Sequence, residues 1–255
     1  MRHIVETGTD GATICFFDPA ALPPDFDERI EDDPVSTFEA LEREGRFWWR
    51  STDGDGSYLF HFYVDQDVPE PISTHSRGAA TVARFLVPSG VIWACGAEYA
   101  ARDPARGHAG TPKGGLDRYA HMGGRFELAR GAYALKAWRA EWPERTRSQE
   151  LEKRVGKAAV SRLNRLGMVT GVLFFGLIAL SGVAVALTLV ALVATLLGRR
   201  GLGISVLLWF WCALLALWAL GWPLMRWTTR MERSPARREA EREFPSVVIQ
   251  MRRIS

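Results

Sequence analysis

Residues 168–197 read MVTGVLFFGLIALSGVAVALTLVALVATLL, and no charged residue occurs between Arg165 and Arg199. A bilayer core of about 30 Å is crossed by about 20 helical residues. A helix in the core of a globular protein does not usually stay apolar on all faces over such a length. The stretch therefore predicts a transmembrane helix over 167–197. Its extra length predicts either a tilt or a first turn that lies in the interface.

A second apolar segment, 204–225, follows after only six residues. It is uncharged from Ile204 to Leu224, and Trp209 and Trp222 stand near its ends, where indoles favour the headgroup level. The short external turn 198–203 forces the two helices to run antiparallel. The sequence thus predicts a two-helix transmembrane hairpin.

Basic residues on either side of the hairpin predict its orientation. Seven lie between Arg145 and Arg165, before the first helix, and six closely follow the second, whereas the turn carries Arg199 and Arg200. The positive-inside rule then places both termini in the cytoplasm and the protein in the cell inner membrane. Anionic headgroups of the bilayer are the partners expected for these cations.

Small residues mark a packing face on the first predicted helix. Gly167 and Gly171 form a GxxxG pair, and Ala179, Gly182 and Ala186 continue at helical spacing. Packing against the second helix and assembly into a homo-oligomer are both compatible with this pattern. Neither span contains an ionisable residue, so solute transport is not expected.

The region 1–143 is predicted to be a cytoplasmic β-rich domain. Three strand pairs are predicted as hairpins: 46–51 with 57–64, 81–87 with 91–96, and 125–128 with 132–142. One helix, Pro34 to Glu44, is predicted from Ser36 and Glu39, which match a capping box. The expected fold class is mainly β, an antiparallel sandwich or barrel with one short helix, followed by the transmembrane hairpin.

Two further segments flank the predicted spans. Residues 144–166 predict an amphipathic stalk helix, which could extend the first span, lie on headgroups or pair as a coiled coil. Residues 226–255 form a basic cytoplasmic tail. Its stretch 246–251 is β-like, and we expect it to pair with an edge of the N-terminal sheet.

Charge and motif content exclude several function classes. Residues 1–70 hold five basic and 17 acidic side chains, and the basic residues gather beside the predicted spans, so no nucleic-acid partner is expected. No signal peptide, nucleotide-binding motif, zinc-protease motif or nucleophile elbow occurs. The three cysteines, Cys15, Cys95 and Cys212, match no metal or redox spacing and are expected as free thiols. No metal and no cofactor are predicted.

Binding residues are expected in the longest segments without predicted secondary structure, 19–33 and 101–123, because loops on a rigid sheet commonly carry them. In the second of these, His108, Lys113, Asp117 and His121 are the candidate ligand-binding residues. No catalytic set is predicted.

The order of parts is similar to that of membrane effectors of bacterial defence systems and of some immunity proteins against secreted toxins. No motif identifies a family. The leading hypothesis is a non-enzymatic, membrane-anchored binding or sensor module for a cytoplasmic protein or small ligand. The alternatives are a ligand-triggered, oligomerising membrane-disrupting effector and a membrane-associated enzyme of unknown reaction.

Overall fold

The chain forms two compact units, 1–143 together with 242–255, and 144–241. The computed structural model describes residues 1–111, 114–155, 157–196 and 235–254, and eight residues between 211 and 226, namely 211, 212, 215, 218, 219, 222, 223 and 226. The first unit carries the strands and is treated first.

The first unit contains two sheets. Sheet A has the strand order β1-β4-β9-β8-β5, and sheet B has the order β3-β2-β6-β7. The strands are β1 (Arg2–Thr9), β2 (Thr13–Phe17), β3 (Phe47–Ser51), β4 (Gly56–Val64), β5 (Ser76–Val87), β6 (Val91–Gly96), β7 (Gly123–Glu127), β8 (Gly131–Ala140) and β9 (Val247–Ile254).

Each short connection between consecutive strands crosses from one sheet to the other. The turns β1–β2, β3–β4, β5–β6 and β7–β8 all do so, while the longer connections return to the same sheet. The three predicted hairpins are therefore wrong, because the strands of each pair lie in different sheets. Alternating apolar residues on two strands joined by a turn can be buried in two ways. The strands can pair in one sheet as a hairpin, or they can lie in two facing sheets joined by an arch.

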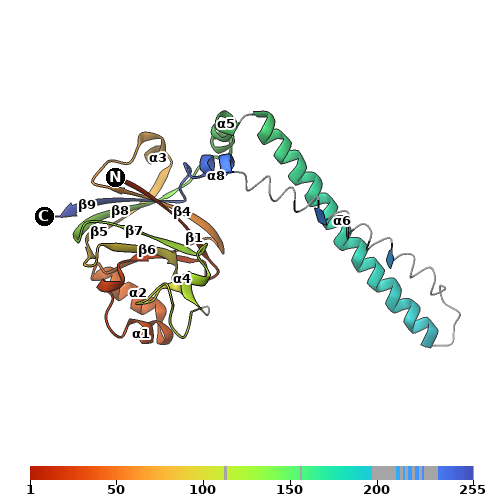
Figure 1. Ribbon diagram of the computed structural model, residues 1–255, viewed down its shortest axis with the longest axis horizontal. Coiled ribbons are helices and arrows are strands. Elements are labelled where there is room, and N and C mark those ends of the chain that lie inside the picture. Colours follow the sequence, from red (N-terminus) through yellow and green to blue (C-terminus); the bar gives the residue numbers. More distant parts are fainter. Residues whose placement is uncertain are drawn as a thin grey trace. The chain divides into compact units, whose positions relative to one another are not determined.

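Strand β9 lies inside sheet A, parallel to β4 and antiparallel to β8 (Figure 1). The predicted pairing of the C-terminal stretch with the N-terminal sheet is confirmed, but its position at an edge is wrong. Val248, Ile249 and Met251 are fully buried, as expected for a strand with neighbours on both sides. Because β4 and β9 run parallel, the predicted all-antiparallel fold class is also wrong, and the fold is mixed α/β with two sheets.

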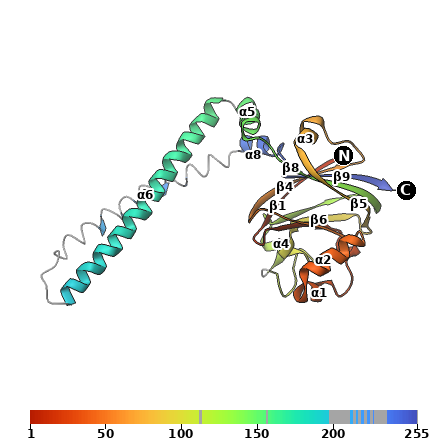
Figure 2. The same ribbon diagram turned by 180° about the vertical axis from the view of Figure 1, so that it is seen from behind.

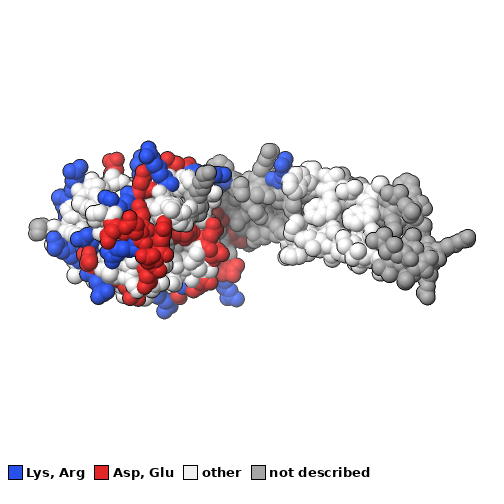
Figure 3. All heavy atoms as spheres, turned by 90° about the horizontal axis from the view of Figure 1, so that it is seen from below, with Lys and Arg blue, Asp and Glu red and all other residues white. Residues whose placement is uncertain are grey.

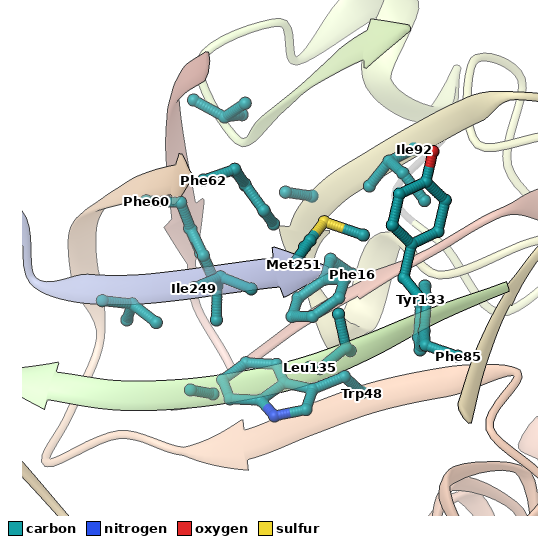
Figure 4. Close-up of a cluster of buried hydrophobic side chains, with 14 of the residues drawn as sticks. Phe16, Trp48, Phe60, Phe62, Phe85, Ile92, Tyr133, Leu135, Ile249 and Met251 are labelled. Carbon is teal, nitrogen blue, oxygen red and sulfur yellow. The ribbon is translucent and has the colours of Figure 1, made fainter. Parts of the chain in front are cut away.

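The main core lies between the two sheets. Phe16 of β2 is fully buried, and its ring lies 4.9 Å from that of Trp48 and 5.3 Å from that of Phe62 between centroids. Figure 4 shows Phe16 among side chains from both sheets, including Met251 of β9 and Leu135 of β8. The C-terminal strand thus completes the core of the N-terminal domain.

Helices cover the outer face of sheet B, which corrects the prediction of one short helix (Figures 1 and 2). Cys15 and Phe17 alternate with Phe16 and point to this second core, so both faces of β2 are buried. The helices of the first unit are α1 (Phe26–Asp32), α2 (Pro34–Arg43), α3 (Glu70–Thr74), α4 (Gly115–Arg118) and the short 3-10 helices η1 (Pro19–Ala21) and η2 (Ala97–Tyr99).

The predicted helix at 34–44 is confirmed as α2, with a different cap. Asp33 Oδ1, and not Ser36, accepts the capping hydrogen bond, from Ser36 N at 3.1 Å. Phe38 and Leu41, three residues apart on the helix, face the second core. The helix ends before Gly45, which has φ +71°, and a Cβ there would lie 1.8 Å from Arg84 O.

The second unit contains α5 (Glu144–Val155), α6 (Lys157–Leu196) and α8 (Pro235–Glu241). Ala184 of α6 is buried, and the hydroxyls of Ser181 and Thr188 accept hydrogen bonds from the indoles of Trp218 and Trp211 at 3.2 and 3.1 Å. Other apolar side chains of α6, such as Met168 and Phe175, are exposed.

Within the described residues, no helix joins the length and the hydropathy that a membrane crossing requires. This finding overturns the predicted transmembrane hairpin and its placement in the inner membrane with cytoplasmic termini. An uncharged apolar run does not by itself establish a membrane crossing, because such runs also occur in helices that pack on protein. The turn 198–203 and most of 204–225 lie outside the described residues.

Candidate binding groove

A groove of about 620 Å³ lies on the outer side of sheet B. It is lined by the α1–α2 region, by Thr13 of β2 and Trp49 of β3, by the start of η2, and by residues 108–110. Two long connections thus meet beside one sheet. Loops that lie on such a scaffold are common positions for binding residues.

The floor of the groove is aromatic and aliphatic. The rings of Phe38 and Trp49 lie 5.7 Å apart, and Phe38 stacks on the buried Phe47 at 4.8 Å. Val35, at the start of α2, is 52% exposed and lies on the groove wall. Apolar surface left open beside a packed core is typical of a contact site.

Glu31 and His108 form one polar wall. Glu31 Oε1 lies 3.1 Å from His108 Nδ1 and accepts a hydrogen bond from Gly110 N at 3.2 Å. Gly110 N also lies 3.1 Å from His108 Nδ1, but that nitrogen cannot both donate to Glu31 and accept from Gly110. A hydrogen bond from Nδ1 to the charged Glu31 Oε1 is stronger than one from Gly110 N to a neutral nitrogen, so we assign the proton to Nδ1.

The loop that carries His108 is held by its own hydrogen bonds. Thr111 Oγ1 donates to His108 O at 2.8 Å and accepts from His108 N at 2.9 Å. Gly107 has φ +75°, and a Cβ there would lie 2.1 Å from Thr111 Oγ1. The imidazole is therefore positioned by a closed turn that only glycine fits at this place.

Glu98 forms the other polar wall. Its carboxylate accepts hydrogen bonds from Asp10 N at 2.7 Å and from Thr9 Oγ1 at 3.1 Å. A Cβ on Gly96 would lie 2.6 Å from Glu98 Oε1, so the close fit of the backbone also depends on a glycine. Glu98 is held in one orientation by neutral donors.

The surroundings of the groove are acidic. Residues 23–44 hold nine acidic and two basic side chains. Figure 3, which views the molecule from below, shows acidic side chains gathered in a band across this unit. Glu42 pairs with Arg50 at 2.5 Å, but among the described residues no Lys or Arg lies within 4 Å of Glu31 or Glu98. The groove therefore combines an apolar floor with two carboxylates that lack a strong cationic partner.

The two segments that were predicted to carry binding residues, 19–33 and 101–123, do contact each other. Arg102 N donates to Asp27 Oδ1 at 3.0 Å, and the Glu31–His108 contact lies nearby on the same two segments. They contain more ordered structure than predicted, because α1 lies in the first and α4 in the second.

The predicted site residues are dispersed. His108 lines the groove, whereas Asp117, in α4, and His121 are exposed and are not among its lining residues. Lys113 lies outside the described residues. Glu31, Glu98 and Trp49 were not predicted. The acidic run 25–33 was a signal for Glu31, whereas Glu98 and Trp49 join the site only through strand pairing.

The predicted helix-packing residues all lie on α6. Ala179 and Ala186 are exposed, and a Cβ on Gly171 or Gly182 would meet no described atom within 4 Å outside the backbone of the same helix. The surroundings of Gly167 lie outside the described part. Among the described residues, α6 accepts hydrogen bonds from Trp211 and Trp218 at Thr188 and Ser181, and the Phe174 ring lies 6.3 Å from that of Trp218.

A second polar cluster lies in the interior of the first unit. His61 is fully buried, its Nε2 lies 2.6 Å from Arg242 O, and its Nδ1 lies 3.3 Å from the Tyr63 hydroxyl. Burial lowers the pKa of His61 to about 4, so the ring is neutral at pH 7. Arg2 pairs with Glu243 at 3.1 Å beside it. This cluster fixes the segment that leads into β9 and is structural.

No protein-family model and no curated protein match this sequence. Similar solved structures include a protein described as Crocagin biosynthetic gene J. It is 14% identical, with 58% of this chain and 81% of that chain covered, at a TM-score of 0.38. Another is ComJ, the inhibitor of the DNA degrading activity of NucA, from Bacillus subtilis. It is 15% identical, with 57% and 87% covered, at a TM-score of 0.31. At these values neither similarity indicates a function for this chain.

Proposed function

We propose that the first unit is a non-enzymatic binding module that holds a segment of a protein partner in the groove beside α2. The observation that carries the proposal is the apolar lining of the groove, in which the exposed Val35 and the half-buried Trp49 lie beside the buried Phe38, between the walls of Glu31 and Glu98. Apolar contacts would supply affinity, and the carboxylates would set orientation and specificity.

The state of the groove supports binding without a large rearrangement. Its walls are held by hydrogen bonds from Thr111, Gly110, Thr9 and Asp10 to the loop or to the carboxylates. A site that is already ordered loses little conformational entropy when a partner docks.

A protein partner fits the groove better than a small molecule does. Acidic side chains are numerous along α1 and α2, beyond the residues that line the groove, and a field of this extent steers a charged macromolecule. An enzyme that uses His108 with Asp117 and His121 is less well supported, because the latter two do not line the groove.

A selection of random 12-residue peptides displayed on phage tests the proposal on the full chain. Val35→Asn removes an exposed apolar contact from the groove, and Ile254→Asn is a matched control at a 41% exposed isoleucine on β9, outside the groove lining. We expect peptides that bind the wild type and the Ile254→Asn control at least about tenfold better than Val35→Asn. Peptides that bind all three proteins equally would overturn the proposal.

A further inference from the structure

We infer that the group recognised in this groove is an arginine side chain of the partner, lying over Trp49 with its guanidinium between the carboxylates of Glu31 and Glu98. The inference rests on the proposed binding function and names the chemistry of the partner. It follows from three features of the groove: charge, floor and fixed acceptor geometry.

The two carboxylates have acceptor capacity that the described chain leaves unused. Glu31 Oε1 receives the contacts from His108 and Gly110, while its Oε2 has no hydrogen-bond partner among the described residues. Glu98 is bound only by neutral donors, a hydroxyl and a backbone amide. A cation that enters between them meets two negative charges, each of which can accept charge-assisted hydrogen bonds.

The floor suits a planar cation. The Trp49 Nε1 atom is buried and has no hydrogen-bond partner within the described part of the chain, so the polar edge of the ring is turned away from solvent. The face of an indole attracts a cation through its quadrupole. The chain's own arginines already use such contacts: Arg50 lies 5.1 Å from the Trp48 ring centroid and Arg125 lies 5.5 Å from that of Trp93.

Arginine fits these features better than lysine. A guanidinium stacks flat on an aromatic ring and directs N–H donors sideways in its plane, where acceptors on two sides can be reached at once. An ammonium is a compact, strongly hydrated charge that gives up more solvation on an apolar floor. The aliphatic stem of the arginine would cover Val35 and Ile30, which also line the groove.

The test is a titration of the full ¹⁵N-labelled chain with N-acetyl-arginine N-methylamide, followed by NMR. The matched probe is the citrulline analogue, which keeps the shape and loses the charge. The Trp49 indole signal is assigned with Trp49→Phe. We expect saturable shifts at Trp49 and Gly110, with the citrulline probe at least fivefold weaker. Glu98→Gln and Glu31→Gln should each weaken arginine binding, and Glu127→Gln, on the exposed side of β7, should not.

The outcomes separate this inference from the function on which it rests. Equal binding of both probes, or arginine shifts that leave Trp49 and Gly110 unmoved, would overturn the arginine assignment. If peptides selected on the groove still depend on Val35, the binding function stands and only the arginine is wrong. If neither the peptides nor the probes depend on the groove, the proposed function is wrong as well.

Discussion

His61 Nε2 donates a hydrogen bond to the carbonyl oxygen of Arg242, 2.6 Å away and 181 positions later in the chain. This contact joins β4 to the segment that leads into β9. It makes the stability of the first unit sensitive to acid, because a buried imidazole whose pKa is lowered to about 4 resists protonation in the folded state.

The sign of the pH effect follows from that pKa. In the unfolded chain a histidine titrates near 6.5, so below this pH the unfolded state binds more protons and stability falls until about pH 4. We expect His61 to account for a loss of about 2 kcal/mol between pH 7.5 and pH 5. Urea unfolding at the two pH values measures it, and His61→Gln should remove this part of the pH dependence. An unchanged pH dependence in His61→Gln would refute the assignment.

Strand β9 is expected to be indispensable to the first unit. Ile249 is fully buried in the core between the sheets, and Ile249→Ala should cost about 3 to 4 kcal/mol in unfolding free energy. Ile254→Ala, at a 41% exposed position of the same strand, should cost less than about 1 kcal/mol. Chemical denaturation measures both variants, and equal small losses would show that β9 does not complete the core.

The second unit is inserted between β8 and β9, and the two ends of the insertion are tied together in the first unit. Ala140 N donates to Ser246 O at 2.9 Å, and the Trp142 indole donates to Pro245 O at 3.0 Å. Replacing 144–241 with a short Gly/Ser linker should therefore leave the first unit folded. Thermal unfolding by near-ultraviolet circular dichroism tests this. Loss of a cooperative transition would mean that the first unit depends on the inserted one.

The cysteines should differ sharply in reactivity. Cys15 and Cys95 are fully buried, with their sulfurs 3.8 Å apart, and burial raises the pKa of the Cys15 thiol well above its usual range. Cys212 is exposed. N-ethylmaleimide should add once to the native chain and three times to the denatured chain by mass spectrometry. Any adduct on native Cys212→Ser would contradict the burial of the pair.

Local patterns predicted where the helices and strands of the first unit lie better than which strands pair with each other. The helix at 34–44 and many strand positions follow from caps and alternation, which are local properties. The β-like stretch 246–251 also indicated a strand. Its place beside β4 and β8 depends on distant strands: Val247 pairs with Arg139, 108 positions earlier, and with Phe60, 187 positions earlier, so no local pattern indicates the neighbours.

The mispredicted hairpins have a common cause. Trp48 and Phe60 contact each other across the core from different sheets, whereas a hairpin would pair them as neighbours in one sheet. Both arrangements satisfy the same apolar spacing. The transmembrane prediction failed for a related reason. Hydropathy indicates that a segment is apolar, but it does not indicate which groups the segment contacts.

The candidate site was predictable only in part. The sequence indicated the two long segments and His108, but Glu98 and Trp49 reach the groove through sheet B, whose order was not predicted. The acidic run 25–33 could be recognised in the sequence. Which of its side chains face the groove is decided by the packing of α1 on the second core.

The most direct test of the account is the dissociation constant of the best groove-selected peptide, measured for the wild type, Val35→Asn and Ile254→Asn. We predict a dissociation constant at least about tenfold larger for Val35→Asn and unchanged for Ile254→Asn, because Val35 lines the groove and Ile254 does not. Equal constants for all three proteins would contradict the claim that this groove is the binding site.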